Sequence, residues 1–242
     1  MAHGKTVMKL ENVWKVYGEG DAKVEALKLI DLEVKKGEII AIMGPSGSGK
    51  STMLHILGLL DRPTEGKLYL DGIETSTLND DELAEIRGKK IGFVFQFFFL
   101  IPSLTVQENV ELPMMLLGMS NIDRERRARE LLAKVGLADR MRHLPSELSG
   151  GQRQRTAIAR ALANDPAIIL ADEPTGNLDS KTGKEILDLF EDLNKKEGRT
   201  IIFVTHDPSL VSRTKRVVRL RDGIKEHEME RGKKSNKSKY WQ

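Results

Sequence analysis

Residues 39–52 read IIAIMGPSGSGKST. The five apolar residues at 39–43 predict a buried strand, and a helical pattern follows from about residue 52. Residues 44–51 match the spacing GxxxxGK[ST], in which a glycine-rich turn directs backbone N–H groups at phosphate oxygens. The flanking strand and helix argue against a merely flexible turn. We expect the phosphates to be held by Gly44, Pro45, Ser46, Gly47, Ser48, Gly49, Lys50, Ser51 and Thr52.

The overall composition is that of an ordinary globular protein. The chain has 242 residues, of which 39% are hydrophobic and 31% charged, so it can form one large domain or two small ones. No apolar run reaches the roughly 18 residues that a membrane span needs, and the N-terminus lacks the apolar centre of a signal peptide. Cysteine is absent, which fits a reducing compartment. We therefore expect a cytoplasmic protein.

The net charge of +3 is concentrated at the C-terminus. Residues 231–242 contain five basic residues and no acid, and the rest of the chain holds 34 basic and 36 acidic residues, a net charge of −2. The main domain is therefore not a basic nucleic-acid binder, and we expect no specific nucleic-acid partner. We predict a disordered tail at 231–242; contact with anionic lipid or nucleic acid is the alternative.

The N-terminal part predicts antiparallel strands. Residues 8–17 and 24–34 alternate between apolar and polar side chains before any helix begins, and residues 67–70 lead into Asp71-Gly72, a hairpin signature. The strands at 39–43, 91–95, 167–171 and 200–204 are instead continuously apolar and are separated by helical patterns, which is typical of a parallel sheet covered on both faces. A final hairpin is expected at 217–223. The predicted class is α/β.

Between Pro102 and Asn164 only helical patterns occur, at 105–117, 123–135 and 152–162. They predict a helical insert over about 97–164 within a single domain spanning 1–230. The last of these helices begins after Ser149, with Gln152 three residues on, a spacing that forms a capping box.

Polar residues follow several of these strands directly. In open α/β sheets, ligands bind where parallel strands end. The residues placed there are Lys50, Gln96, Asp172, Glu173 and His206.

Together with the segment Leu148-Ser149-Gly150-Gly151-Gln152, this set closely resembles the ATP-binding-cassette ATPases, the nucleotide-driven subunits of ABC transporters. The resemblance covers about residues 8–227. Its motifs occur in the family's order: the phosphate loop, Gln96, the LSGGQ signature, Asp172-Glu173, Asn177-Leu178-Asp179-Ser180 and His206. It implies a P-loop NTPase core with a mainly parallel sheet, an N-terminal antiparallel region and a helical insert, ATP and Mg²⁺ as cofactors, and ATPase activity.

The resemblance also assigns roles to the polar residues. It implies that Ser51 and Gln96 bind Mg²⁺ directly and that Asp172 holds it through water. In-line attack on the γ-phosphorus needs a positioned water, and Glu173 is the candidate group that orients or deprotonates it. His206 would contact the γ-phosphate, so the catalytic set is Glu173, His206 and Gln96. The alternatives are a helix-capping role for the two carboxylates and a packing role for His206.

Tyr17 resembles the aromatic residue on which the family stacks adenine, because an aromatic ring suits the π face of a base. The alternative is a strand tyrosine on a half-buried face.

The signature implies a second subunit. In the family, the corresponding residues meet the γ-phosphate of ATP bound to another copy, so that two head-to-tail copies enclose two ATP molecules. The residues that would make this contact are Leu148, Ser149, Gly150, Gly151, Gln152 and Asp179. We therefore expect an ATP-dependent homodimer that switches between two states.

Residues 101–113 and 172–179 resemble the lipoprotein-releasing and macrolide-export branch of the family. This implies a transmembrane permease on a separate chain, and a location on the inner face of the cell membrane through that partner. Phe97-Phe98-Phe99 departs from the branch, which carries polar residues at the first and third of these positions. The aromatic run is either a docking surface for the membrane partner or buried in the helical insert.

Two other functions remain open at this point. One is a soluble cassette ATPase that acts in DNA repair or on ribosomes. A DNA-repair ATPase of this fold would carry a long coiled-coil insert between the phosphate loop and the signature, and a ribosome-acting one would carry a second cassette. In this chain only 97 positions separate Lys50 from Leu148, and they show no sustained heptad repeat. A cell-division or regulatory ATPase that moves no cargo is also compatible with the sequence.

Overall fold

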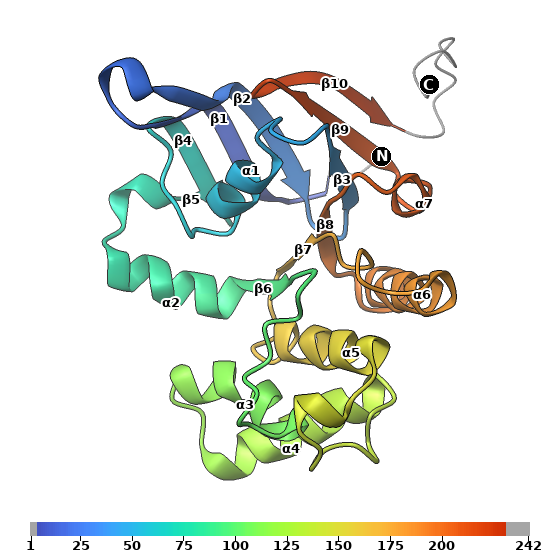
Figure 1. Ribbon diagram of the computed structural model, residues 1–242. Helices are drawn as coiled ribbons and strands as arrows, with labels where there is room; N and C mark the ends of the chain where they lie inside the picture. The colour runs from blue at the N-terminus through green and yellow to red at the C-terminus, as the bar shows by residue number, and fades with distance from the viewer. Residues whose placement is uncertain (1–3, 231–242) are drawn as a thin grey trace.

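A computed structural model describes residues 4–230, which form two β-sheets with helices packed on them (Figure 1). The predicted basic tail at 231–242 lies outside the described residues. Figure 1 shows the sheets in the upper part of the molecule and helices α3, α4 and α5 at its lower end.

The larger sheet has six strands and carries the phosphate loop. Its five parallel strands are joined by β10, which pairs antiparallel with β9 at one edge. The spatial order is β10 (Ile224–Glu230), β9 (Arg216–Arg221), β3 (Ile39–Met43), β8 (Thr200–Val204), β7 (Ile168–Asp172) and β6 (Ile91–Val94). The predicted parallel sheet and the final hairpin are thus present. The carboxyl ends of β3, β8, β7 and β6 lie side by side.

The smaller sheet is antiparallel throughout, as predicted for the N-terminal region. Its order is β2 (Val24–Lys35), β1 (Thr6–Tyr17), β4 (Glu65–Leu70) and β5 (Ile73–Glu74). The register of β1 against β4 is interrupted after Glu11, where Asn12 adopts a left-handed φ of 50°. Opposite this irregularity Gly66 has a φ of +82°, and a Cβ there would lie 2.3 Å from the Asn12 carbonyl oxygen.

The central strands are continuously apolar because each face packs against a different core. Ile39 and Ala41 of β3 belong to the core formed with α3, α4, α5 and α6, whereas Ile40 and Ile42 belong to the core formed with α1 and the smaller sheet. All four of these residues are buried. Residues of β7 and β8 divide between the two cores in the same alternation. Because successive side chains of a strand point to opposite faces of the sheet, each apolar strand contributes side chains to both cores.

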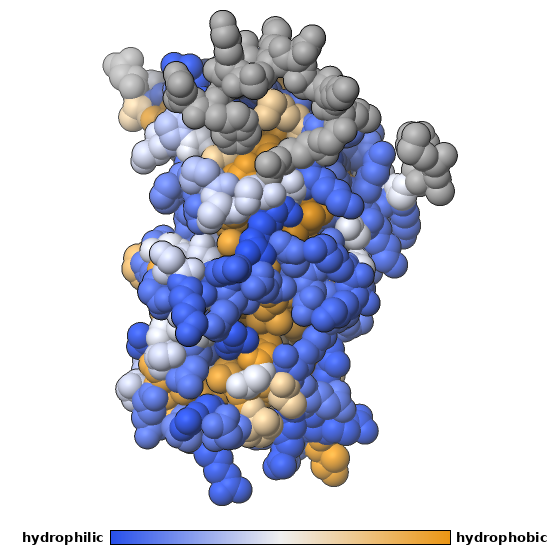
Figure 2. Space-filling model, turned by 90° about the vertical axis from the view of Figure 1, so that its right-hand side faces the viewer, coloured by the Kyte–Doolittle hydropathy of each residue, from blue (hydrophilic) through white to orange (hydrophobic). Residues whose placement is uncertain are grey.

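The helices occupy both faces of the six-stranded sheet. Helix α1 (Lys50–Leu57) packs against β2, β7 and β8. On the opposite face lie α3 (Val106–Leu116), α4 (Asn121–Lys134), α5 (Gly150–Ala161) and α6 (Ser180–Glu197), where Phe190 meets Phe203 edge to face at 5.1 Å. Figure 2, which views the molecule from the right of Figure 1, shows a largely hydrophilic exterior with hydrophobic patches along its middle.

Two helices of the structure were not predicted from the sequence. Helix α2 (Asp80–Lys90) is mostly polar and buries only Leu83, so it has no apolar period; its visible signal is the capping box of Asn79 and Glu82. Helix α7 (Pro208–Val211) is a single turn. The helix expected from about residue 52 begins at Lys50 and ends at Leu57, where Gly58 caps it and Leu59 has a left-handed φ of 54°.

The close approach of Gly66 in β4 to the backbone of β1 leads to a prediction about stability. Gly66→Ala combines left-handed strain with a backbone clash, and we expect it to lower the free energy of unfolding by about 3 kcal/mol. Gly72→Ala is the matched control, because Gly72 has a φ of +85° but no atom within 4 Å of its added Cβ. Strain alone should cost about 1 kcal/mol there. Urea unfolding measures both variants, and equal losses would show that the β1–β4 contact is not tight.

Candidate nucleotide site

The phosphate loop joins β3 to α1 in a conformation that requires glycine. Gly49 precedes the helix with a φ of +97°. The Lys50 ammonium folds back on the loop and donates to the carbonyl oxygens of Gly44 and Pro45, each at 2.8 Å. The Ser48 hydroxyl is buried and has no hydrogen-bond partner among the described residues. Because first-turn N–H groups have no acceptor within a helix, the start of α1 offers donors to an anion.

Two carboxylates lie at the end of β7, where Asp172 is the last residue of the strand and Glu173 follows it. Glu173 has a left-handed φ of 43° and its N–H donates to Val204 at 2.9 Å. The Thr205 hydroxyl donates to Glu173 Oε2, while the His206 N–H donates to Oε1, both at 2.9 Å. His206 Nδ1 lies 2.5 Å from the same Oε1. The end of β8 therefore holds the Glu173 carboxylate in one orientation.

Asp172 lies in a partly buried environment. Burial raises the pKa of Asp172 above its ordinary value of 3.8, and the nearby charge of Glu173 raises this pKa further. The positive charges of His55 and Lys50 oppose that rise in the pKa. A cation bound beside the pair would relieve their repulsion.

The structure excludes the simpler explanations for these residues. The helices that follow β7 and β8 are capped by Asp179 and Asp207, so neither Asp172 nor Glu173 serves as a helix cap. The His206 side chain is 79% exposed and therefore does not pack in the core.

Gln96 lies at the end of β6 and is tied to the loop after Glu173. Its side-chain amide donates to Asn177 Oδ1 at 3.1 Å, and Asn177 Nδ2 donates to the Gln96 carbonyl oxygen at 3.0 Å. Gln154 fixes the same loop from α5 by donating to the Pro174 carbonyl oxygen at 2.7 Å. Sequence reasoning missed Gln154, although its position four residues before Ile158 places it on the buried stripe of α5.

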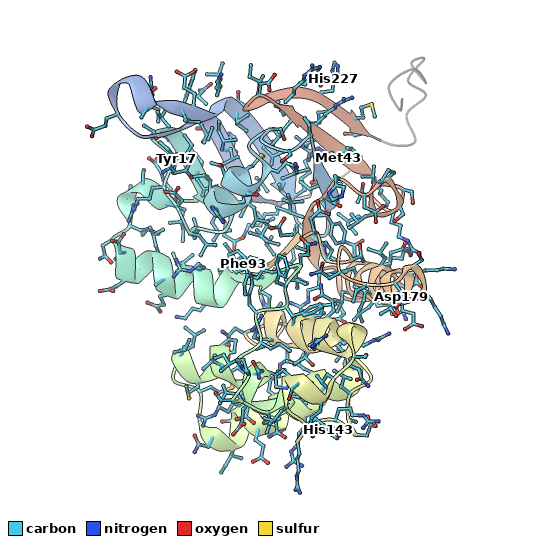
Figure 3. All side chains as sticks on the ribbon, in the orientation of Figure 1. Tyr17, Met43, Phe93, His143, Asp179 and His227 are labelled. Atoms are coloured by element: carbon cyan, nitrogen blue, oxygen red, sulfur yellow. The ribbon has the colours of Figure 1, made fainter. Side chains whose placement is uncertain are left out.

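Tyr17 lies at the end of β1, near α1 (Figure 3). Its hydroxyl donates to Asp61 Oδ2 at 2.8 Å, and the Lys15 ammonium lies 4.8 Å from the centre of its ring. Burial and the neighbouring Asp61 raise the pKa of Tyr17 above 10.0, while a hydrogen bond with Thr52 opposes the rise. Tyr17 is 40% exposed, so its ring is accessible to a stacking partner.

The signature forms the capped start of α5. Ser149 accepts from the Gln152 N–H, and the Gln152 side chain accepts from the Ser149 N–H, which is the predicted capping box. Gly151 is buried against α6, where an added Cβ would lie 2.4 Å from Thr182 Cγ2. Asp179 caps α6, and the hydrogen bonds from Thr182 lower the pKa of Asp179.

The structure brings together one group of the predicted site residues and separates it from the other. Lys50, Gln96, Asp172, Glu173 and His206 follow β3, β6, β7 and β8, the four adjacent strands. Helix α1 packs in the core on one face of this sheet, and α5 packs in the core on the other. No hydrogen bond or ion pair within residues 4–230 joins the signature to the phosphate loop. The signature and the phosphate loop therefore start helices that pack on opposite faces of the sheet.

The sequence comparisons agree with this arrangement of motifs. A family model described as "ABC transporter" matches residues 27–176. The chain belongs to the ABC transporter family. An uncharacterized ABC transporter ATP-binding protein of Thermotoga maritima is 58% identical over 219 residues, which cover 90% of this chain and 93% of that protein. The macrolide export ATP-binding/permease protein MacB of Rhodopseudomonas palustris is 50% identical over 221 residues, or 91% of this chain and 34% of MacB.

A solved structure has the same fold. The ATP-binding cassette MJ0796, described as dimeric in a post-hydrolysis state with ADP and Pi, superposes with a TM-score of 0.85 at 53% identity, covering 92% of this chain and 98% of that one. The chain is an ABC ATPase cassette that binds and hydrolyses ATP.

The residues at the strand ends have the chemistry of a magnesium site. Mg²⁺ prefers hard oxygen ligands and usually keeps several waters beside one or two carboxylates and the phosphates of its substrate. The Asp172 carboxylate, the exposed Ser51 hydroxyl and the Gln96 amide oxygen are such donors. The residues present therefore fit the ion.

The electrostatics of Asp172 generate a pH prediction. The pKa of Asp172 is raised in the folded state, so its ionised form lowers stability above that pKa, and this cost disappears as the pH falls below the unfolded value of 3.8. Asp172→Asn should therefore stabilise the nucleotide-free cassette at pH 7, by no more than about 1 kcal/mol because the carboxyl is partly solvated.

Thermal unfolding of both proteins between pH 8 and pH 4 measures this difference in stability. The gain should shrink as the pH falls. A destabilised variant at pH 7, or a gain that grows with acid, would show that Asp172 is not held in an unfavourable ionised state.

Proposed function

We propose that this ABC ATPase cassette hydrolyses ATP in a composite site shared by two copies and so drives a membrane transporter that works in the outward direction. The observation that carries the proposal is that α1 and α5 begin on opposite faces of one sheet, each with a capped or glycine-rich start that can receive phosphate. A second copy placed head to tail would present its signature to the phosphate loop of the first.

In this proposal the residues at the strand ends have different roles in ATP hydrolysis. Lys50 exchanges its loop carbonyls for the β- and γ-phosphates, and Ser51 and Gln96 would hold Mg²⁺ directly and Asp172 through water. When bound, this ion neutralises charge on the phosphate oxygens. Glu173, held by Thr205 and His206, accepts a hydrogen bond from the attacking water and aligns it with the γ-phosphorus.

His206 has a second partner available. Its exposed ring contacts Glu173 and, in the proposal, turns to the γ-phosphate when ATP is bound. Tyr17 stacks on adenine. Leu148, Ser149, Gly150, Gly151 and Gln152, with Asp179, complete the site of the partner copy.

The export branch is supported by the relatives that carry this cassette. MacB, named as a macrolide export protein, joins a cassette 50% identical to this chain to a permease in one polypeptide. Within residues 4–230 no helix is both long and apolar enough to cross a bilayer. We propose a permease on a separate chain, which would hold the cassette at the cytoplasmic face of the membrane.

The aromatic segment after Gln96 supports a docking surface. The side chains of Phe97 and Phe99 are 68% and 60% exposed, whereas Phe98 is partly buried under the Arg153 guanidinium at 5.5 Å. The proposal includes one ABC ATPase domain at 1–230 with a helical subdomain at about 97–164 that presents this surface.

The composite site predicts a trapped dimer. Glu173→Gln keeps the shape of the side chain but removes the group that accepts the water's proton, so hydrolysis should fall by at least about 100-fold while ATP binding persists. With ATP the variant should elute as a dimer in gel filtration with light scattering, and without ATP as a monomer. The double variant with Lys50→Ala is the control and should stay monomeric. Glu173→Gln that remains monomeric with saturating ATP would contradict the composite site.

A further inference from the structure

A closed set of three contacts holds the Tyr17 ring near α1 (Figure 3). The Tyr17 hydroxyl donates to Asp61 Oδ2 at 2.8 Å, and the Lys15 ammonium donates to Asp61 Oδ1 at 2.6 Å. The same ammonium lies 4.8 Å from the centre of the Tyr17 ring. Each of the three residues therefore contacts both of the others. Because the ring is held at its hydroxyl and on one face, it cannot rotate without losing one of these contacts.

Lys15 is the most buried member of this set. Its side chain is only 12% exposed, and its ammonium also donates to the Arg62 carbonyl oxygen at 2.9 Å. Another lysine of β1, Lys9, pairs with Glu11, but its side chain is 44% exposed. Fixing a lysine side chain costs rotamer freedom, and a mostly buried ammonium needs partners. The pair of Lys15 and Asp61 is therefore tighter than an ordinary surface ion pair.

The backbone of Asp61 is fixed to the end of α1. Its N–H donates to the carbonyl oxygen of His55, in the last turn of that helix, at 3.3 Å. The same helix begins at Lys50 in the phosphate loop. Asp61 therefore places the Tyr17 ring relative to the helix whose first turn is the proposed phosphate site.

The same contacts decide which face of the ring is available. The Lys15 ammonium covers one face, and Tyr17 as a whole is 40% exposed. A base that stacks on Tyr17 would therefore take the opposite face. Stacking of a base on an aromatic ring contributes roughly 5- to 150-fold in affinity, and a ring that is already fixed loses less of that gain to ordering.

We propose that Lys15 and Asp61 are positioning residues for base recognition. They fix the Tyr17 ring so that its free face receives the adenine, and they thereby determine how strongly the site prefers a nucleotide to a polyphosphate without a base. The proposal rests on the stacking role proposed for Tyr17. Lys15 and Asp61 act through the ring and do not themselves contact the base.

Binding of ADP and of inorganic pyrophosphate to the full-length chain, measured by calorimetry, tests this role. ADP carries a base and pyrophosphate does not, so an effect that acts through Tyr17 changes only the affinity for ADP. Lys15→Met removes the cation, and Asp61→Asn leaves one oxygen where the carboxylate uses two. Each should weaken ADP binding about 3- to 10-fold and leave pyrophosphate binding unchanged. Lys9→Met, which breaks the pair with Glu11 on the same strand, is the matched control and should change neither affinity.

A Tyr17→Ala background separates positioning from direct contact. This variant alone should weaken ADP binding by at least about fivefold, because the stacking surface is lost. Adding Lys15→Met or Asp61→Asn to it should weaken ADP binding no further, since residues that act only through one side chain are not additive with its removal.

The outcomes distinguish this inference from the proposed function. If Tyr17→Ala leaves ADP binding unchanged, the stacking role is wrong and the inference is overturned with it. If Tyr17→Ala weakens ADP binding but Lys15→Met and Asp61→Asn do not, only the inference is overturned. A parallel loss of pyrophosphate binding in these two variants, or an effect that persists in the Tyr17→Ala background, also contradicts a role through the ring.

Discussion

Burial of the parallel strands on both faces is the constraint on which the rest of this structure depends. With one core formed by α1 and the smaller sheet and another formed by α3 to α6, a charged side chain within β3, β7 or β8 would be desolvated without a partner. Charged and hydrogen-bonding groups are therefore confined to the strand ends. Because these strands are parallel, their polar residues gather at one edge, where the phosphate loop also opens.

The same two-sided packing separates the two phosphate-binding elements. Helix α1 belongs to one layer and α5 to the other, so the phosphate loop and the signature of each copy precede helices on different faces of the sheet. The hydrogen bonds among Gln96, Asn177 and Gln154 join the strand ends to α5. The loop after Glu173 is consequently in contact with both the end of β6 and α5.

The sequence allowed most of the site to be predicted, because an apolar strand that ends in a polar residue is a local pattern. That pattern placed Lys50, Gln96, Asp172, Glu173 and His206 at one edge. It could not predict the order β3, β8, β7, β6, because pairing between strands distant in sequence leaves no local trace. Thr205 and Gln154 were missed since their roles arise from contacts made only in the folded chain. Helix α2 was missed because its exposed, polar surface lacks apolar periodicity.

The central claim, that each ATP site takes its phosphate loop and its signature from different copies, is tested most directly by mixing two inactive variants. Lys50→Ala removes the phosphate contact and Ser149→Arg blocks the signature. A mixed dimer would combine one intact loop with one intact signature, so an equal mixture should regain roughly a quarter of the wild-type ATP turnover. A mixture as inactive as either variant alone, or a Ser149→Arg variant that is active by itself, would contradict the account.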